Sequence, residues 1–254
     1  MIHPTAVIHP NAQVAENAEI GPYVIIDEHV SLGVNCVVGP QVHLTGHTEI
    51  GEKNRFHTGC VIGDAPQDFK YDSSPTKLRI GEGNTFREHV TVHRSNKLEE
   101  DTIIGSHNFL MAHSHVGHNC ILHDHVILAN GALLGGHVEV FDRVFISGNC
   151  LVHQFVRIGT MSLMQGGAGI SMDLPPYCIA WGDNGLCGLN VIGLRRAGIG
   201  AADRSELKRC YQAFLNEPDE SALGEFKSQY AQQMIEFVHS SRRGVCRHKN
   251  RRRD

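Results

Sequence analysis

The sequence lacks the features that mark several classes of protein. It has no apolar run of about 18 residues or more, so we expect no transmembrane segment. Its first residues contain neither a basic stretch nor an apolar stretch, so we expect no signal peptide. The eight cysteines are spread singly without a Cys-x-x-Cys pair, which favours reduced thiols and a cytoplasmic protein over disulfides or structural zinc. The net charge of −4 argues against general binding of nucleic acid.

Charge and hydrophobic pattern divide the chain into two regions. Residues 1–174 carry 10 Lys or Arg against 18 Asp or Glu, whereas residues 175–254 carry 13 against 9. We predict one domain over 1–175, followed by a linker and a C-terminal helical region over 176–254. In the second region two sets of apolar residues follow the spacing of a helix: Leu207, Cys210, Tyr211, Phe214 and Leu215, then Leu223, Phe226, Tyr230, Met234, Phe237 and Val238.

The first region is built on a six-residue repeat, or hexad. Every sixth residue from Ile2 to Ile170 is aliphatic, Phe or Met at 27 of 29 positions, and the exceptions are Asp68 and Ser74. A helix repeats every 3.6 residues and a strand every 2, so neither alone explains this period. The period is typical of a parallel β-helix, in which short strands wind around a prism filled by these side chains. The pattern resembles the hexapeptide-repeat family, which implies a left-handed parallel β-helix with a C-terminal α-helical region and three hexads in each coil.

Two polar segments interrupt the repeat without shifting its register. They span residues 64–77 and 94–102, and we expect both to be loops that leave the coils. Loops on a rigid scaffold often carry function. The first loop contains Asp68 and Lys70, which could fold toward one edge of the prism.

Several histidines are expected along one edge of the prism. If one coil takes three hexads, equivalent positions of successive coils lie above one another in the stack. His118, His137 and His153 would then share an edge, with Gln154 beside them. His115 lies just upstream on the same coil as His118. Titratable side chains gathered in this way are what acid–base catalysis requires.

A metal site is an alternative use of these histidines. Some proteins of this fold resemble carbonic anhydrases, which bind zinc between subunits through histidines. Zinc requires three or four ligands, and the position two regular coils before His118 is Glu82. We favour catalysis without a metal.

Five local motifs resemble one family of enzymes, the UDP-N-acetylglucosamine O-acyltransferases that use acyl carrier protein and begin lipid A synthesis. The match runs essentially end to end. The motifs are Gln67–Tyr71, His115–Cys120, Gly135–Val138, Val152–Phe155 and Gly188–Arg196. The resemblance implies that a homotrimer, without cofactor or metal, transfers a 3-hydroxyacyl chain from acyl carrier protein to the 3-hydroxyl of UDP-N-acetylglucosamine.

The resemblance also implies roles for single residues. His118 is expected to be the general base, and the backbone N–H of Gly136 is expected to stabilise the oxyanion. Gly166 is expected to act as a ruler that leaves room for a long acyl chain. The other residues expected to bind substrate are Gln67, Asp68, Lys70, His115, His137, His153, Gln154, Asn190 and Arg196.

Three residues depart from the pattern of the best-known members. Asn119 stands where they carry Asp, Ile192 where they carry an acidic residue, and Ala197 where they carry Arg. An Asn can hydrogen-bond an imidazole but adds no charge, so we expect Asn119→Asp to be neutral or mildly activating. The other two departures concern the nucleotide contacts.

Other functions stay open from sequence alone. An N-acyltransferase of the same pathway shares the fold but has a domain before the repeat, whereas the hexads here start at Ile2. Acetyl-CoA-dependent acetyltransferases usually lack the loop at 67–71 and the long helical region. A related enzyme could use another nucleotide amino sugar, and a non-catalytic scaffold would have no convergent histidines. For the enzyme, we expect acidic acyl carrier protein to dock on the basic C-terminal region.

Overall fold

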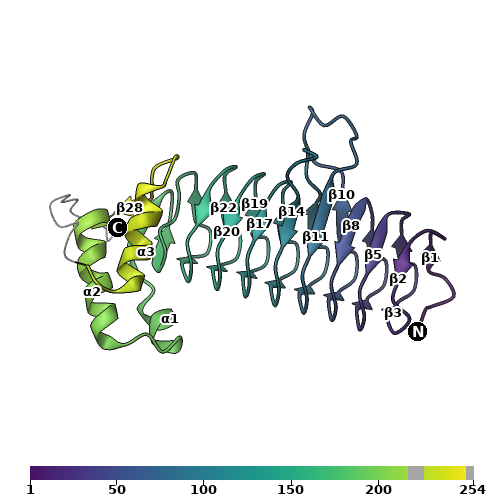
Figure 1. The fold of residues 1–254 in the computed structure, drawn as a ribbon, viewed down its shortest axis with the longest axis horizontal. Coiled ribbons are helices and arrows are strands. Elements are labelled where there is room, and N and C mark those ends of the chain that lie inside the picture. The colour runs from purple at the N-terminus through teal and green to yellow at the C-terminus, as the bar shows by residue number, and fades with distance from the viewer. Residues whose placement is uncertain (217–225, 250–254) are drawn as a thin grey trace.

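The chain winds into a long three-sided column of parallel strands with helices at its C-terminal end (Figure 1). This computed structural model describes residues 1–216 and 226–249. Up to residue 170, consecutive strands enter three sheets in turn, so neighbours within one sheet are three elements apart in the chain. This topology is that of the parallel β-helix predicted from the repeat.

The described residues form three sheets. The first sheet contains nine strands: β1 Val7–Ile8, β4 Ile25–Ile26, β7 His43–Leu44, β10 Val61–Asp64, β13 Thr91–His93, β16 His115–Val116, β19 Leu133–Leu134, β22 Leu151–Val152 and β25 Gly169–Ile170. The second sheet contains eight: β2 Gln13–Val14, β5 Val30–Leu32, β8 His47–Ile50, β11 Lys77–Ile80, β14 Thr102–Ile104, β17 Ile121–Leu122, β20 Glu139–Val140 and β23 Arg157–Ile158. The third sheet contains eleven: β3 Glu19–Ile20, β6 Val37–Val38, β9 Arg55–Phe56, β12 Thr85–Phe86, β15 Phe109–Leu110, β18 Ile127–Leu128, β21 Phe145–Ile146, β24 Leu163–Met164, β26 Cys178–Trp181, β27 Gly185–Leu189 and β28 Arg247–His248.

The six-residue repeat places its large apolar side chains inside the prism. Leu110, Leu128 and Ile146 pair in register on successive coils of the third sheet, and all three are fully buried. Smaller side chains such as Cys120 and Val138 fill the angles between sheets. Burial of one large aliphatic side chain contributes about 1.5–3 kcal/mol, so a ladder of them holds the coils together.

The chain turns between sheets at residues with a left-handed backbone. Asn119 and His137 have φ angles of 57° and 60°. Such angles are uncommon outside glycine, although Asn and His adopt them more readily than most residues. These corners aim neighbouring side chains away from the prism, which places the histidine edge at the surface of the column.

The two predicted loops leave the coils where the repeat is interrupted. Val61 pairs with His43 in the coil before it and with Thr91 in the coil after it, so the coil that contains the first loop is two hexads longer than its predecessor. Leu78 pairs with Thr102, so the second loop lengthens its coil by one hexad. Both insertions are whole hexads, which is why the register survives. Leu98 fits the repeat but lies in the second loop with 59% of its surface exposed, so it is not a core position.

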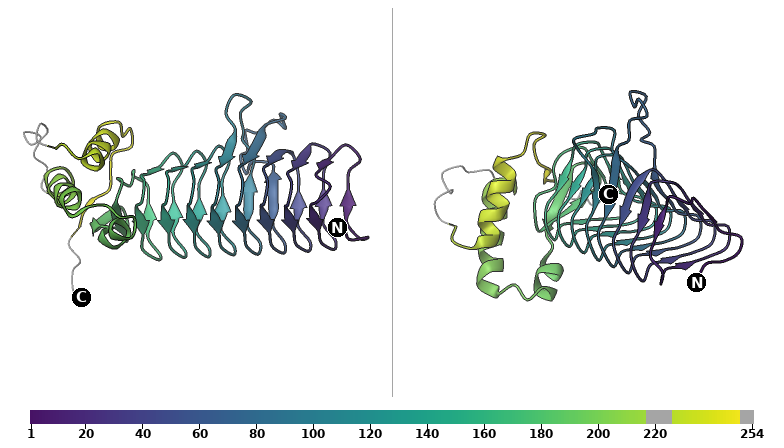
Figure 2. Two further views of the ribbon diagram at one scale, coloured as in Figure 1. Left: turned by 60° about the horizontal axis from the view of Figure 1, so that its bottom comes forward. Right: turned by 45° about the vertical axis from the view of Figure 1, so that its right-hand side comes forward.

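The C-terminal helices pack beyond the last coils (Figure 2). They are α1 Val191–Arg196, α2 Ala201–Tyr211, the π-helical turn η1 Gln212–Asn216 and α3 Gln229–His239. The apolar residues predicted from Leu207 to Leu215 lie in α2 and η1, whereas Leu223 and the end of the basic tail lie outside the described residues. Strand β28 returns to pair with β27. No helix in the described part of the chain is long and apolar enough to cross a membrane.

Candidate active site

The predicted histidines lie on the edge of the prism where the chain turns from the first sheet to the second. His118 follows β16, His137 follows β19, and His153 follows β22. These three strands pair in register on successive coils. The stacking expected from coils of three hexads therefore holds along this part of the edge.

A cavity of about 580 Å³ opens beside this edge over the first sheet. Among the residues expected to act on substrate, those that line it are Gln67, His115, His118, Gly136, His153 and Gln154. The first loop and three coils therefore contribute to one site, although residues from 67 to 154 are spread along the chain. The cavity also has lining residues that we did not predict, among them His93, Asp183 and Asn184.

The floor of the cavity changes from a histidine to apolar side chains along the first sheet. The outward residues His115, Leu133, Leu151 and Gly169 follow one another on adjacent strands. Leu133 and Leu151 line the cavity although 41% and 56% of their surfaces are exposed. A polar end with histidines and an apolar floor suits a ligand that has a polar head and a hydrocarbon chain.

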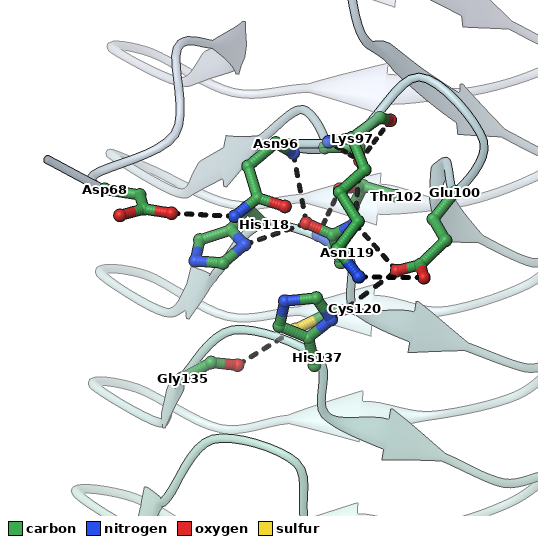
Figure 3. A network of polar contacts seen from close by, with 11 residues as sticks. Asp68, Asn96, Lys97, Glu100, Thr102, His118, Asn119, Cys120, Gly135 and His137 are labelled. Carbon is green, nitrogen blue, oxygen red and sulfur yellow. Dashed lines mark hydrogen bonds and ion pairs between the residues drawn. The ribbon is translucent and has the colours of Figure 1, made fainter. Parts of the chain in front are cut away.

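A hydrogen-bond network fixes the ring of His118, which is only 8% exposed (Figure 3). Its Nδ1 lies 2.8 Å from Oδ1 of Asn119. The backbone N–H of Asn96 donates to the same Oδ1 at 3.1 Å, which identifies this atom as the amide oxygen. Because the oxygen can only accept, Nδ1 of His118 carries the proton and Nε2 is left as the basic nitrogen.

Gly136 lies one coil beyond His118 and directly against its ring. A Cβ atom at this position would come within 2.6 Å of Cε1 and Nε2 of His118. Only glycine leaves room for the imidazole here. The backbone N–H of Gly136 has no hydrogen-bond acceptor among the described residues, so a ligand beside the basic nitrogen could use it.

Asp68 brings a negative charge from the first loop toward His118. Its carboxylate accepts a 2.7 Å hydrogen bond from the side chain of Asn96. The backbone N–H of Lys70, the Asn96 amide and the nearby His118 all lower the pKa of Asp68, so it stays ionised. The Lys70 side chain is exposed and forms no ion pair within the described part of the chain.

His93 is a site residue that the sequence did not reveal. It is buried, lines the cavity and lies edge-on to the ring of His115, with the ring centroids 5.1 Å apart. Burial, followed by the nearby His93 and His118, lowers the pKa of His115 to about 4, so His115 is neutral near pH 7. One extra hexad lies between His93 and His115, so His93 falls outside the 18-residue spacing that relates the other histidines.

His137 borders a second groove instead of the cavity. Its ring lies edge-on to His118 at 5.1 Å and stacks on Phe155 at 4.5 Å. Nδ1 of His137 lies 3.7 Å from a carboxylate oxygen of Glu100. The groove on this side has a volume of about 780 Å³ and also contains Asn119 and Arg243. His137 and His118 thus mark the ridge between two hollows.

Three other predicted residues lie away from the cavity of their own chain. The side chain of Asn190 caps α1 through the N–H of Gly193 at 3.0 Å and donates to the carbonyl of Met161 at 2.9 Å. Arg196 is exposed at the end of α1. Gly166 follows β24, at the opposite edge of the first sheet from His118. None of the three lines the cavity beside His118.

The alternative that pairs His118 with Glu82 in a metal site is wrong. Thr91 pairs with His115, so the second loop makes the coil before His118 one hexad longer than a regular coil. Glu82 lies between β11 and β12, at the edge between the second and third sheets. Across residues 1–216 and 226–249, no group of three or more His, Cys, Asp or Glu is arranged to hold a metal ion.

Two family models match the chain. The one described as Udp N-acetylglucosamine O-acyltransferase, Domain 2, matches residues 173–246, and the one described as Bacterial transferase hexapeptide (six repeats) matches residues 101–136. The acyl-(acyl-carrier-protein)–UDP-N-acetylglucosamine O-acyltransferase of Syntrophobacter fumaroxidans is 41% identical over 97% of this chain and 99% of its own length. That of Halorhodospira halophila is 38% identical over the same shares. The chain belongs to this acyltransferase family.

Solved structures of the family have the same fold. The UDP-N-acetylglucosamine acyltransferase from Bacteroides fragilis is 35% identical, with a TM-score of 0.92 over 97% of this chain and 100% of that chain. LpxA from Acinetobacter baumannii is 35% identical, with a TM-score of 0.93 over 97% of this chain and 99% of that chain. The resemblance seen in the five motifs is confirmed, and so is the predicted left-handed parallel β-helix with C-terminal helices.

Proposed function

We propose that this acyltransferase transfers a 3-hydroxyacyl chain from acyl carrier protein to the 3-hydroxyl of UDP-N-acetylglucosamine, the first step of lipid A synthesis. The proposal rests above all on His118, whose Nδ1–H is held by Asn119 and whose Nε2 lies against Gly136 in the cavity. The names of the relatives supply the two substrates. The apolar floor at Leu133 and Leu151 suits the hydrocarbon chain.

In the proposed reaction, the imidazole of His118 and the backbone N–H of Gly136 act on the substrates. Nε2 of His118 removes the proton from the sugar hydroxyl as its oxygen attacks the thioester carbonyl carbon. The carbonyl oxygen becomes an oxyanion, which the backbone N–H of Gly136 stabilises. The C–S bond then breaks, and the imidazolium returns the proton to the thiolate of the carrier. The products are the ester and the free carrier thiol, with no acyl-enzyme intermediate.

The surrounding residues position the substrates. Asp68 is ionised and close to His118, so it can accept a hydrogen bond from the sugar. Gln67, His115, His153 and Gln154 line the cavity around the reacting atoms. Lys70 and His137 flank this region from the first loop and from the ridge.

We assign the more distant residues to the site of a neighbouring subunit. Arg196 is exposed and outside the cavity of its own chain, and an arginine is a natural partner for the nucleotide phosphates. In a homotrimer, Asn190 and Arg196 of one subunit would meet the cavity of the next. We expect the enzyme to act in the cytoplasm and the basic C-terminal region to be the docking surface for acyl carrier protein.

The proposed function is tested by following thioester consumption with UDP-N-acetylglucosamine and a 3-hydroxyacyl carrier protein. We expect turnover that requires both substrates, and His118→Ala should lower kcat by roughly 100- to 10,000-fold with little change in KM. His125→Ala is the matched control, because His125 is an exposed histidine at another corner of the prism. Activity of His118→Ala within threefold of the parent would remove His118 from the mechanism.

The same assay separates the remaining alternatives. Turnover only with another nucleotide amino sugar would keep the chemistry and change the acceptor. Turnover with acetyl-CoA in place of the carrier would indicate a different donor. No thioester consumption with any of these would favour a non-catalytic scaffold.

A further inference from the structure

Glu100 connects the second loop to the network that holds His118. Its Oε2 accepts a hydrogen bond from the Asn119 amide at 3.3 Å and lies 3.7 Å from Nδ1 of His137 (Figure 3). Its Oε1 accepts a 3.0 Å bond from the ammonium group of Lys97. One carboxylate therefore touches both the amide that orients His118 and the ring beside it.

Both the oxygen and the nitrogen of the Asn119 amide are hydrogen-bonded, so this side chain links Glu100 to His118. Its oxygen faces His118 and the backbone N–H of Asn96, whereas its nitrogen donates to Ser95 at 2.7 Å and to Glu100. The hydroxyl of buried Ser95 already donates to the carbonyl of Lys97. The amide cannot rotate by half a turn without losing these bonds, so Glu100 and Ser95 help keep its oxygen on His118.

We propose that Glu100 is a positioning residue for the base, because it anchors the Asn119 amide. It also supplies a negative charge that reaches His118 through Asn119, whereas an Asp at position 119 would place that charge directly beside the ring. This inference rests on the proposed role of His118. It explains how a neutral Asn can serve at this position, because the charge comes from the second loop. During proton transfer, the carboxylate stabilises the imidazolium through the polarised amide.

Other titratable and charged groups also face this network. Asp68, His93, His115 and His137 lie within electrostatic range of His118. Lys97 is the cation bound to Glu100, and Arg242 and Arg243 line the groove that Glu100 borders. Glu100 is about half exposed, so we expect its effect to be modest.

The proposal changes the outcome expected for Asn119→Asp. An Asp at this position would place its second oxygen against the Glu100 carboxylate and against Ser95, whose hydroxyl proton is already used. Like charges at this distance repel. The single variant should therefore lose activity, whereas the sequence alone suggested a neutral or mildly activating change.

The first experiment measures kcat and KM against pH for Glu100→Gln, which keeps a hydrogen-bond acceptor and removes the charge. We expect kcat at high pH to fall about threefold, the acid limb of the profile to move about half a pH unit lower, and KM for the nucleotide sugar to stay constant. Lys97→Met should move the acid limb the opposite way. Glu99→Gln is the control, because Glu99 makes no hydrogen bond or ion pair with any described residue.

The second experiment restores the charge at the other position. The Asn119→Asp/Glu100→Gln double variant should recover at least half of the parent kcat, because Gln can donate to the new carboxylate. A parent enzyme that is inactive in the thioester assay overturns the proposed function itself. If the parent is active, three results would overturn the role of Glu100 alone. In the first two, Glu100→Gln leaves the pH profile unmoved or lowers the rate equally at every pH. In the third, the double variant is no better than Asn119→Asp.

Discussion

The imidazole of His118 fits in its position because Gly136, one coil away, has no side chain. Because a Cβ at position 136 would lie 2.6 Å from the ring, Gly136 is required for the position of the proposed base as well as for access to its own N–H. The added Cβ would meet the far end of the imidazole, so we expect the ring to move aside without loss of the fold. A substitution of Gly136 should therefore lower catalytic activity much more than it lowers stability.

We predict that Gly136→Ala lowers kcat by at least about 100-fold, because the added methyl group displaces the base from reacting distance. The melting temperature should change by only a few degrees, since the ring can move toward solvent. Steady-state kinetics and thermal unfolding monitored by circular dichroism measure the two effects. Parent-like kcat in a folded variant would show that His118 does not work from the position seen here.

His115 gives the protein a pH-dependent stability. Its pKa in the folded chain is lowered to about 4, mainly by burial and then by His93 and His118, whereas an unfolded His titrates near 6.5. The unfolded state thus binds the proton more tightly. The contribution of neutral His115 to the free energy of unfolding is fully present above about pH 6.5 and is lost as the pH falls from there toward 4.

We predict that His115→Gln reduces this acid sensitivity, because Gln cannot take up a proton and can still bond Thr91, the present partner of the imidazole. The drop in melting temperature between pH 7.5 and pH 5 should be smaller than in the parent by at least about 3 °C. His113→Gln, at an exposed corner of the same coil, should keep the parent difference. An unchanged drop in His115→Gln would mean that His115 is not protonated on unfolding over this range.

At the scale of elements, we expect the coil that carries Gly166 to limit how far a bound acyl chain can extend. A Cβ there would meet only the carbonyl oxygen of Gly148, at 3.6 Å, so the position is open to solvent or to a neighbouring chain. The polar end of the site lies across the first sheet, at His118. A chain bound along this sheet between subunits would run from one edge toward the other.

We predict that the parent prefers a fourteen-carbon over a ten-carbon 3-hydroxyacyl donor, and that Gly166→Met reverses the order by filling the far end of the groove. Each methylene removed from a buried chain forfeits about 0.8 kcal/mol, so the parent preference should be large. The ratio of kcat/KM for the two donors measures it. If Gly166→Met keeps the parent ranking, Met161 or Met164 becomes the next candidate for the ruler.

At the scale of the whole molecule, the distribution of site residues favours an assembly. The cavity of one chain holds His118 but not Arg196, and its apolar floor is open on the outer face of the first sheet. A single prism face cannot enclose a nucleotide sugar and an acyl chain. Light scattering at micromolar protein should give a homotrimer, and a fully active monomer would overturn this assignment.

We predict that two inactive subunits can rebuild active sites together. His118→Ala and Arg196→Ala homo-oligomers should each have low activity, and co-refolding them should restore a fraction of the parent rate. A mixed interface can combine an intact His118 from one chain with an intact Arg196 from the other. Co-refolding His118→Ala with itself is the control. No recovery in verified mixed oligomers would place both residues in the site of one chain.

The repeat made the prism and most of the histidine edge predictable, because side-chain period and coil length are local properties of the sequence. His118, His137 and His153 were found in this way. His93 and Glu100 were not, because the two inserted loops changed the coil length around them and brought them to the edge from outside the repeat. Leu98 matches the period by residue type, but it lies in the loop predicted over residues 94–102.

The sequence by itself determined the β-helix, the two loop positions and the family, because each depends on a period or motif read along the chain. Only the tertiary structure decided which atoms meet: the Asn119 oxygen on His118, the Glu100 carboxylate on the Asn119 amide, and the ring of His118 on Gly136. These contacts join residues from different coils and loops. Their geometry depends on left-handed corners and on the lengths of insertions, which fix how the coils stack but leave no periodic trace in the sequence.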